Sequence, residues 1–296
     1  MKIEIKGTKV DDIYLGINHI NNSFKLSDID IFESTVIEIS SKSSFIPIHM
    51  LILLGYHINT LETKRKKCIF KGTNEVGNFL KTCGFESFIN SSRIDKWNLR
   101  DSVILPFSKL PTPSGCQKYL DNFVNRVNYE IKYEIIDQIG EIHNNSIIHG
   151  KTQDIFIMGQ FYPKSNSIHI IIYDGGNGML NYDINDYINK IGDKFSTIKF
   201  KEEIKNKFGI EAFFIILCVC TNFSTRGING GMGLQELSRF LYRNNGVIHI
   251  SSGKTYLNIG FKEICSIIDI NNVIVNHKRL DNNIKGTYIS FTFSIK

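Results

Sequence analysis

The stretch that decides the fold is Ile168-His-Ile-Ile-Ile-Tyr173, followed by Asp174-Gly-Gly-Asn-Gly-Met179. The apolar run predicts a buried strand, and the glycines predict a turn directly after it. The strand therefore delivers one carboxylate, that of Asp174, to the start of the turn. A carboxylate accepts hydrogen bonds, for example from the exocyclic amine of adenine, and glycines let a planar base approach the backbone. Taken alone, the pattern is also that of an ordinary turn.

A second segment predicts a helix with polar residues on one face. Between residues 116 and 149 apolar residues recur at helical spacing: Tyr119, Phe123, Val127, Ile131, Ile135, Ile139 and Ile142. On this helix Glu141, Asn145 and His149 are four residues apart and form one polar line. An amide oxygen can bind Mg²⁺, and a carboxylate one turn away can act as a general base. As an isolated pattern, the line is more typical of a solvated helix face.

Two further segments complete the pattern. The loop Gly227-Ile-Asn-Gly-Gly-Met-Gly-Leu234 leads into a predicted helix over 233–241. The backbone N–H groups and the dipole at the start of a helix favour the binding of phosphate. The loop is not a Walker A loop, because no Gly-Lys-Ser/Thr follows it. The last predicted strand, 286–293, carries Thr287 after a glycine.

In this order, the four segments resemble the ATP site of the GHKL superfamily, which includes gyrase, heat-shock chaperones, histidine kinases and mismatch-repair ATPases. Asn145-Ser-Ile-Ile-His-Gly150 is similar to the N box of the anti-sigma-factor kinases. The resemblance implies that ATP and Mg²⁺ are bound, with Asn145 as the metal ligand and Glu141 as the catalytic base. The other residues that it places at the nucleotide are His149, Asp174, Gly176, Gly178, Met179, Gly231, Gly233, Leu234 and Thr287.

The chain is predicted to be α/β with two domains. A proline-rich segment, 106–115, separates residues 1–105 from residues 116–296. Residues 35–83 alternate strand, helix, strand and helix, and resemble a smaller STAS-like α/β domain, which implies binding of a protein partner. The hydroxyl expected at a phosphorylated STAS site is missing, although Ser41, Ser43 and Ser44 lie nearby. For 116–296 the resemblance implies a Bergerat α/β sandwich, a mixed sheet with helices on one face.

The composition of the chain indicates its class of protein and its cellular location. The 296 residues have a formal net charge of +6 and 42% hydrophobic residues, enough for packed cores. The longest apolar stretches are too short to span a bilayer, and the amino terminus has no secretory apolar run. The six cysteines form no C-x-x-C pair, which predicts reduced thiols. We therefore expect a cytoplasmic protein with no membrane or nucleic-acid partner; whether it forms a homodimer stays open.

Three functions fit these patterns. The first is an ATPase switch that couples nucleotide state to a protein partner, and the second is a serine/threonine kinase of the anti-sigma-factor type. The third is a nucleotide-binding scaffold without catalysis. A sensor histidine kinase is disfavoured, because residues 100–142 contain no acceptor histidine.

The GHKL resemblance implies that the interval between the two glycine motifs contains a lid over the phosphates. Its apolar run 210–220 predicts a packed helix, so we expect the lid at the flanks, 193–197 and 222–229. Arg226 in the second flank either binds a phosphate or is solvated.

Overall fold

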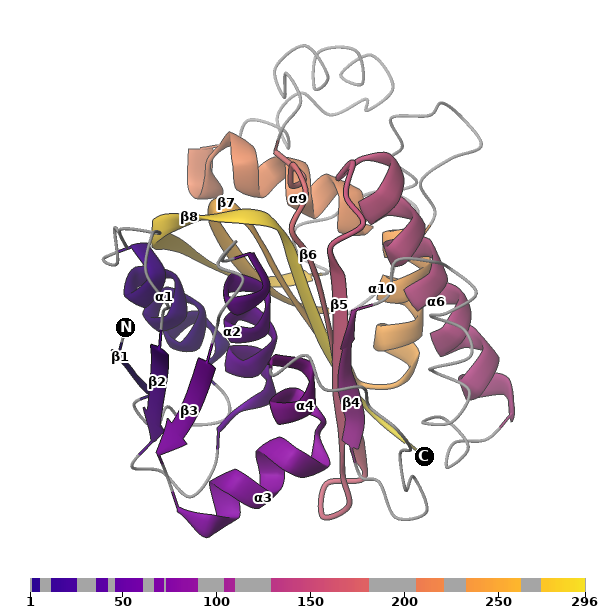
Figure 1. Cartoon of the computed structure of the whole chain (residues 1–296). Helices are drawn as coiled ribbons and strands as arrows, with labels where there is room; N and C mark the ends of the chain where they lie inside the picture. The colour runs from indigo at the N-terminus through magenta and orange to yellow at the C-terminus, as the bar shows by residue number, and fades with distance from the viewer. Residues whose placement is uncertain are drawn as a thin grey trace, which may run out of the picture.

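The computed structural model describes residues 2–5, 12–25, 36–41, 46–60, 67–71, 73–89, 104–109, 129–180, 206–220, 233–261 and 273–295 (Figure 1). A five-stranded sheet forms its centre, with the strand order β4-β5-β6-β8-β7. Its strands are β4 (Ile104–Lys109), β5 (Ile155–Tyr162), β6 (Ser167–Asp174), β7 (Val247–Phe261) and β8 (Val273–Ser294). The predicted strands over 168–173 and 286–293 are confirmed as parts of β6 and β8.

Every neighbouring pair in this sheet is antiparallel. The expectation of a mixed sheet is therefore wrong. The physical reason lies in the connections. A tight turn at 163–166 joins β5 to β6, and such a short connection permits only antiparallel pairing.

Side chains alternate between two hydrophobic clusters on the two faces of the sheet. In β6, Ile170 and Ile172 face one cluster, whereas Ile171 and Tyr173 face the other. Successive residues of a strand point to opposite faces, and both faces here are covered by protein. This explains why the strand is apolar throughout, a pattern more common in parallel sheets.

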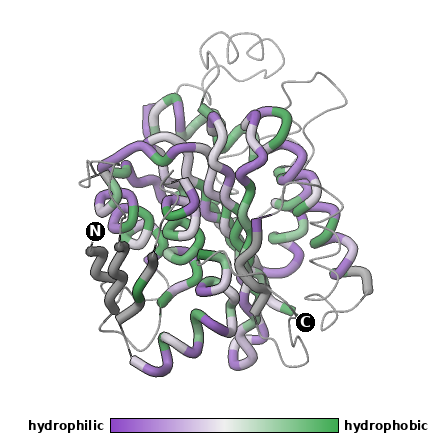
Figure 2. Tube along the Cα trace, viewed as in Figure 1, coloured by the Kyte–Doolittle hydropathy of each residue, from purple (hydrophilic) through white to green (hydrophobic). Residues whose placement is uncertain are grey.

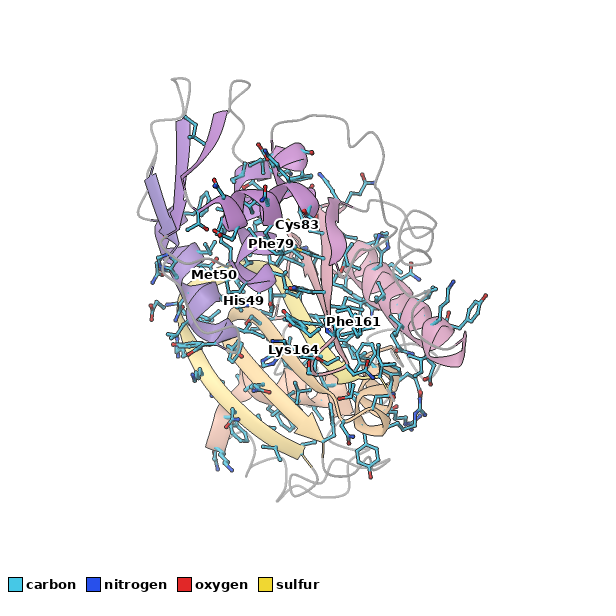
Figure 3. The ribbon with its side chains drawn as sticks, turned by 90° about the horizontal axis from the view of Figure 1, so that it is seen from below. His49, Met50, Phe79, Cys83, Phe161 and Lys164 are labelled. Atoms are coloured by element: carbon cyan, nitrogen blue, oxygen red, sulfur yellow. The ribbon has the colours of Figure 1, made fainter. Side chains whose placement is uncertain are left out.

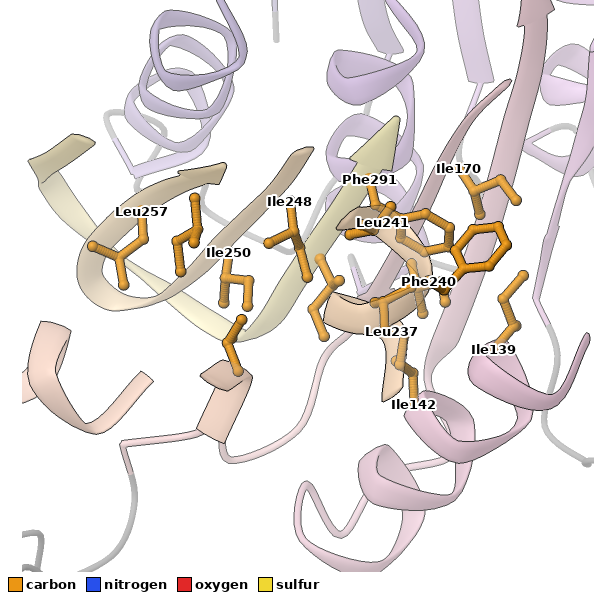
Figure 4. Close-up of a cluster of buried hydrophobic side chains, with 14 of the residues drawn as sticks. Ile139, Ile142, Ile170, Leu237, Phe240, Leu241, Ile248, Ile250, Leu257 and Phe291 are labelled. Carbon is orange, nitrogen blue, oxygen red and sulfur yellow. The ribbon is translucent and has the colours of Figure 1, made fainter. Parts of the chain in front are cut away.

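Helices α6 (Tyr129–Ile148), α9 (Ile210–Cys220) and α10 (Gly233–Arg243) cover the first face. Figure 4 shows Leu237, Phe240 and Leu241 of α10 directed toward the sheet. These residues lie at helical spacing on the buried side of α10. The predicted helix over 210–220 is confirmed as α9, and residues 116–128 of the predicted long helix lie outside the described part of the chain.

Helices α1 (Ile13–Lys25), α2 (Ile48–Thr60) and α4 (Phe85–Ile89) pack on the second face, opposite α6 and α10 (Figure 1). Among the described residues, the helices of 116–296 cover one face only, as predicted for that segment, and helices from 1–105 cover the second face. The amino-terminal segment supplies the second layer, because α2 is apolar almost all round and must be buried.

The predicted strand–helix alternation at the amino terminus is confirmed. A parallel three-stranded sheet has the order β1-β2-β3, formed by β1 (Lys2–Ile5), β2 (Val36–Ser41) and β3 (Lys67–Lys71). Helix α2 follows β2, and α3 (Asn74–Thr82) follows β3. Residues from both predicted domains share the second cluster, so the helices of 1–105 and the large sheet bury one common core. The division into two domains stays a prediction.

The first part of the predicted proline-rich connection is a strand. Residues 104–109 form the edge strand β4, with an irregular register between Leu105 and Ser108, where Pro106 lies. Proline has no N–H to donate and is tolerated at edges and bulges. Residues 110–115 lie outside those described.

Buried histidines lie where α2 meets the sheet. His49 of α2 has no exposed surface, and its ring stands against Gly16 of α1, where a Cβ would lie 2.4 Å from Nε2. Figure 3 labels His49 and Met50 on this helix. His169 and His249 point into the same layer from the strands. Burial lowers the pKa of His49 and His169 to about 3 and that of His249 to about 4.

Hydropathy along the chain follows this layering. Figure 2 shows hydrophobic residues concentrated in α2 and the central strands, with hydrophilic residues on α3. Within the described ranges, no helix combines the length and the apolar character that a membrane span requires.

Candidate functional site

Asp174 lies at the end of β6, and its carboxylate is 5% exposed. The N–H of Gly176 donates to Oδ1 at 3.0 Å, and the Ser146 hydroxyl donates to Oδ2 at 3.1 Å. Burial raises the pKa of Asp174 to about 6, while hydrogen bonds from Gly176, Ser146 and Thr287 act to lower it. At neutral pH the group is therefore an ionised acceptor that is partly shielded from water.

Thr287 is the direct cross-strand neighbour of Asp174, in the register of β6 and β8. Its side chain is buried, and it hydrogen-bonds the carboxylate. The structure thus brings these two residues together, although more than a hundred positions separate them in the sequence.

The glycine turn after Asp174 is clamped onto the end of α6. The N–H of Asn177 donates to the carbonyl of Gly150 at 2.9 Å. A Cβ on Gly176 would lie 2.3 Å from the same oxygen, so no side chain fits there. Gly178 has φ +77°, a left-handed conformation that favours glycine. The two predicted glycines therefore permit a close approach and a reversed backbone.

Met179 is tied to the neighbouring strands. Its N–H donates to Ser252 Oγ at 2.9 Å, and the same hydroxyl donates to the carbonyl of Gly286 at 3.3 Å. The side chain of Met179 packs against the first hydrophobic cluster, as does that of Leu234 at the start of α10. Ser252 was not predicted, since nothing in the sequence near it signals a turn partner.

The polar line is confirmed on α6 for Glu141, which is exposed, and Asn145, which is half-buried, whereas the half-buried His149 lies in the turn directly after the helix ends at Ile148. Gly233 begins α10 directly against Glu141, since a Cβ at Gly233 would lie 2.7 Å from the Cβ of Glu141. The carboxylate of Glu141 therefore lies beside the amino-terminal end of a helix. Asn145 stands one turn further along, next to Ser146.

Ser146 is the site residue that sequence reasoning missed. It continues the buried stripe of α6, four residues after Ile142 and seven after Ile139. A serine on an apolar stripe needs a hydrogen-bond partner inside the protein, and this was the available signal. Its hydroxyl lies 3.1 Å from the carbonyl of Ile142 and from Asp174 Oδ2.

Two predicted site residues, Gly231 and Arg226, lie outside the described residues, as do both predicted lid flanks. The other predicted residues fall into two groups along α6. Asp174, Gly176, Gly178, Met179 and Thr287 lie near Ser146, and Gly233 lies near Glu141. A ligand alongside α6 would meet a buried acceptor at one end and a helix start at the other.

Comparisons of the chain with protein-family models, with curated proteins and with solved structures found no match. The GHKL and STAS resemblances therefore rest on the sequence motifs, and what they imply is proposed below.

Proposed function

We propose that the chain binds ATP with Mg²⁺ beside α6, and that nucleotide state controls its binding to a protein partner. The observation that carries this proposal is the carboxylate of Asp174, buried at a strand end among donors. An unpaired buried charge is unfavourable, so a structure that retains one commonly uses it.

Asp174 would recognise the base. The carboxylate offers about four acceptor positions, and four groups hydrogen-bond it: the Gly176 N–H, the Ser146 hydroxyl, and both the side chain and the backbone of Thr287. An exocyclic amine such as that of adenine would replace one of these donors or share an oxygen with it. Gly176 and Gly178 allow the tight turn that presents this carboxylate, because protein atoms fill the positions where their side chains would lie, and Met179 would supply apolar contact to the base.

Glu141, Asn145 and the start of α10 would act at the phosphates. The amino-terminal end of α10 carries partial positive charge, which favours phosphate oxygens. The amide oxygen of Asn145 suits Mg²⁺, which when bound would offset phosphate charge. Glu141, exposed beside the same helix end, is placed to take a proton from an attacking water or hydroxyl. His149 is half-buried in the turn directly after α6 and would line the same side.

A contact between α2 and the glycine turn supports a switch. A Cβ on Gly175 would lie 2.4 Å from Cε2 of Tyr56, so the tyrosine ring rests on the turn backbone. The rings of Tyr56 and Tyr173 also lie edge to face, with centroids 4.7 Å apart. A ligand that shifts the turn must therefore shift α2 or compress this contact. The amino-terminal segment would report nucleotide state to the partner in this way.

The test is calorimetric titration of Mg²⁺-ATP into the full chain and into Asp174→Ala. Losing the acceptor should weaken binding about ten- to a hundred-fold. Asp137→Ala, an exposed aspartate on α6, is the matched control and should bind as wild type. Equal affinity of wild type and Asp174→Ala would refute the site.

Incubation with labelled ATP then separates the three functions. Phosphate release supports the ATPase switch, and labelled protein supports the serine/threonine kinase. Binding with neither product supports the scaffold without catalysis.

A further inference from the structure

A separate cavity of about 510 Å³ lies on the opposite face of the sheet from Asp174. Its lining residues come from the ends of α1 and α2 and from the β7–β8 hairpin: Asn21, Phe24, His57, Lys254, Asn282 and Asn283. The volume lies within the range of about 300–1,000 Å³ that is usual for small-molecule sites. None of these residues belongs to the site proposed for ATP.

An irregularity in the hairpin forms one wall of the cavity. Gly253 pairs with Ile284, but Thr255 pairs with Arg279, so the intervening residue Lys254 faces four residues on β8. Such a bulge redirects side chains out of the regular ladder. Here it brings Lys254 and the two asparagines 282 and 283 to the same cavity.

Helix α1 holds the bulge in place. The N–H of Asp281 donates to Asn18 Oδ1 at 3.0 Å, and Asn22 Nδ2 donates to Asp281 Oδ2 at 3.0 Å. Asn282 also donates to Asn22 Oδ1. These bonds connect segments about 260 positions apart in the sequence, and they make the wall a fixed part of the fold.

Asn21 presents a donor that no described residue satisfies. Its side chain is 5% exposed, and its Nδ2 has no hydrogen-bond partner within the described part of the chain. Its Oδ1 lies 3.2 Å from His57 Nε2. Burial lowers the pKa of His57 to about 4, so the ring is neutral at pH 7, and the tautomer with its proton on Nε2 donates to Asn21 Oδ1. A buried amide donor without a partner is costly, which points to a ligand acceptor.

The cavity therefore combines donors with a flat apolar wall. Lys254 brings an ammonium group, which only donates, and Asn21 Nδ2 also donates. Phe24 and His57 stack with ring centroids 4.4 Å apart and planes at 14°. We propose that this cleft binds a small organic anion, with carboxylate or phosphate oxygens on Asn21 and Lys254 and a planar group against Phe24 and His57.

The experiment titrates benzoate, phenyl phosphate and the neutral benzamide into the full chain, followed by NMR of labelled histidine rings. Both anions should shift the signals of His57, and benzamide should bind at least about tenfold more weakly. A preference between the two anions identifies the acceptor group as carboxylate or phosphate. If neither anion binds, or if benzamide binds as well as they do, the proposal is overturned.

Variants locate the binding. Lys254→Met and the nearly isosteric Asn21→Leu should each weaken the anions at least about tenfold. Lys164→Met removes the same charge in the turn between β5 and β6, outside the residues that line the cavity, and should leave binding unchanged. Unchanged affinity in Lys254→Met overturns the proposal. Loss of binding in Asp174→Ala would place the anion on the other face and overturn it equally. Circular dichroism would show whether Asn21→Leu folds. If it does not, the anion affinity of Lys254→Met decides the test, since Lys254 is only half-buried.

Discussion

Replacing Asp174 by asparagine should stabilise the nucleotide-free protein at neutral pH. The pKa of this carboxyl is raised by burial from its usual 3.8 to about 6. Ionisation is therefore easier in the unfolded chain than in the folded protein. As pH rises from 3.8 to about 6, ionisation of this carboxyl stabilises the unfolded state relative to the folded state. Above about pH 6 the carboxyl is ionised in both states, and the difference stays constant. Asparagine cannot ionise and avoids this penalty.

The size of the effect follows from the pKa. A rise from 3.8 to about 6, at about 1.4 kcal/mol per pH unit, gives about 3 kcal/mol at pH 8. The gain should fall to about half that at pH 5 and nearly vanish below the usual pKa. Asparagine can keep the bond from Gly176 to its oxygen and donate to Ser146 Oγ, while any loss at the Thr287 donors changes the stability by the same amount at every pH.

The assay is urea unfolding of wild type and Asp174→Asn at several pH values from 5 to 8. The exposed Asp137→Asn is the control and should show no pH-dependent gain. The pH dependence of the stability gain is the decisive quantity, because a change in hydrogen bonding alters the free energy of unfolding by the same amount at every pH. A gain that is constant from pH 5 to 8, or a loss of stability at pH 8, would refute the reasoning about a buried charge.

Three further predictions concern turnover, packing and acid stability. Glu141→Gln should keep nucleotide affinity and lose about a hundred- to ten-thousand-fold in turnover, measured as phosphate release; undiminished turnover would remove its role as base. Gly176→Ala should destabilise the protein in urea unfolding, because its Cβ would meet the Gly150 carbonyl at 2.3 Å. Gly140→Ala in α6 has open space around it and should instead stabilise by about 0.5–1 kcal/mol, and equal effects of the two would contradict the packing argument. Burial lowers the pKa of four histidines to about 3 or 4, so the stability that they contribute is present above pH 6.5 and lost as pH falls toward 3–4. Urea unfolding from pH 7 to 4.5 should show a loss of about 1.4 kcal/mol per histidine and pH unit, and a flat profile would contradict their burial. The histidines concerned are His49, His57, His169 and His249.

The sequence predicted the local elements well, because their signals are contained within a few residues. The apolar run before Asp174 could be only a buried strand or a short buried helix, and the glycines after it required a turn. The spacing of Glu141 and Asn145 placed them on one side of a helix before any tertiary contact was known, although the helix ends just before His149. The strand and helix pattern of 35–83 followed from the same periodicities.

Tertiary structure alone decided how these elements combine. Periodicity shows that a face is buried and does not show what covers it, so the packing of α2 on the sheet was not predicted. The sheet proved antiparallel, and Pro106 proved part of an edge strand, since pairing is set by contacts between distant segments. The partners of Asp174 illustrate the same limit. Ser146 and Thr287 lie 28 positions before it and 113 positions after it, and only the packing of α6 and β8 against β6 brings their hydroxyls to one carboxylate.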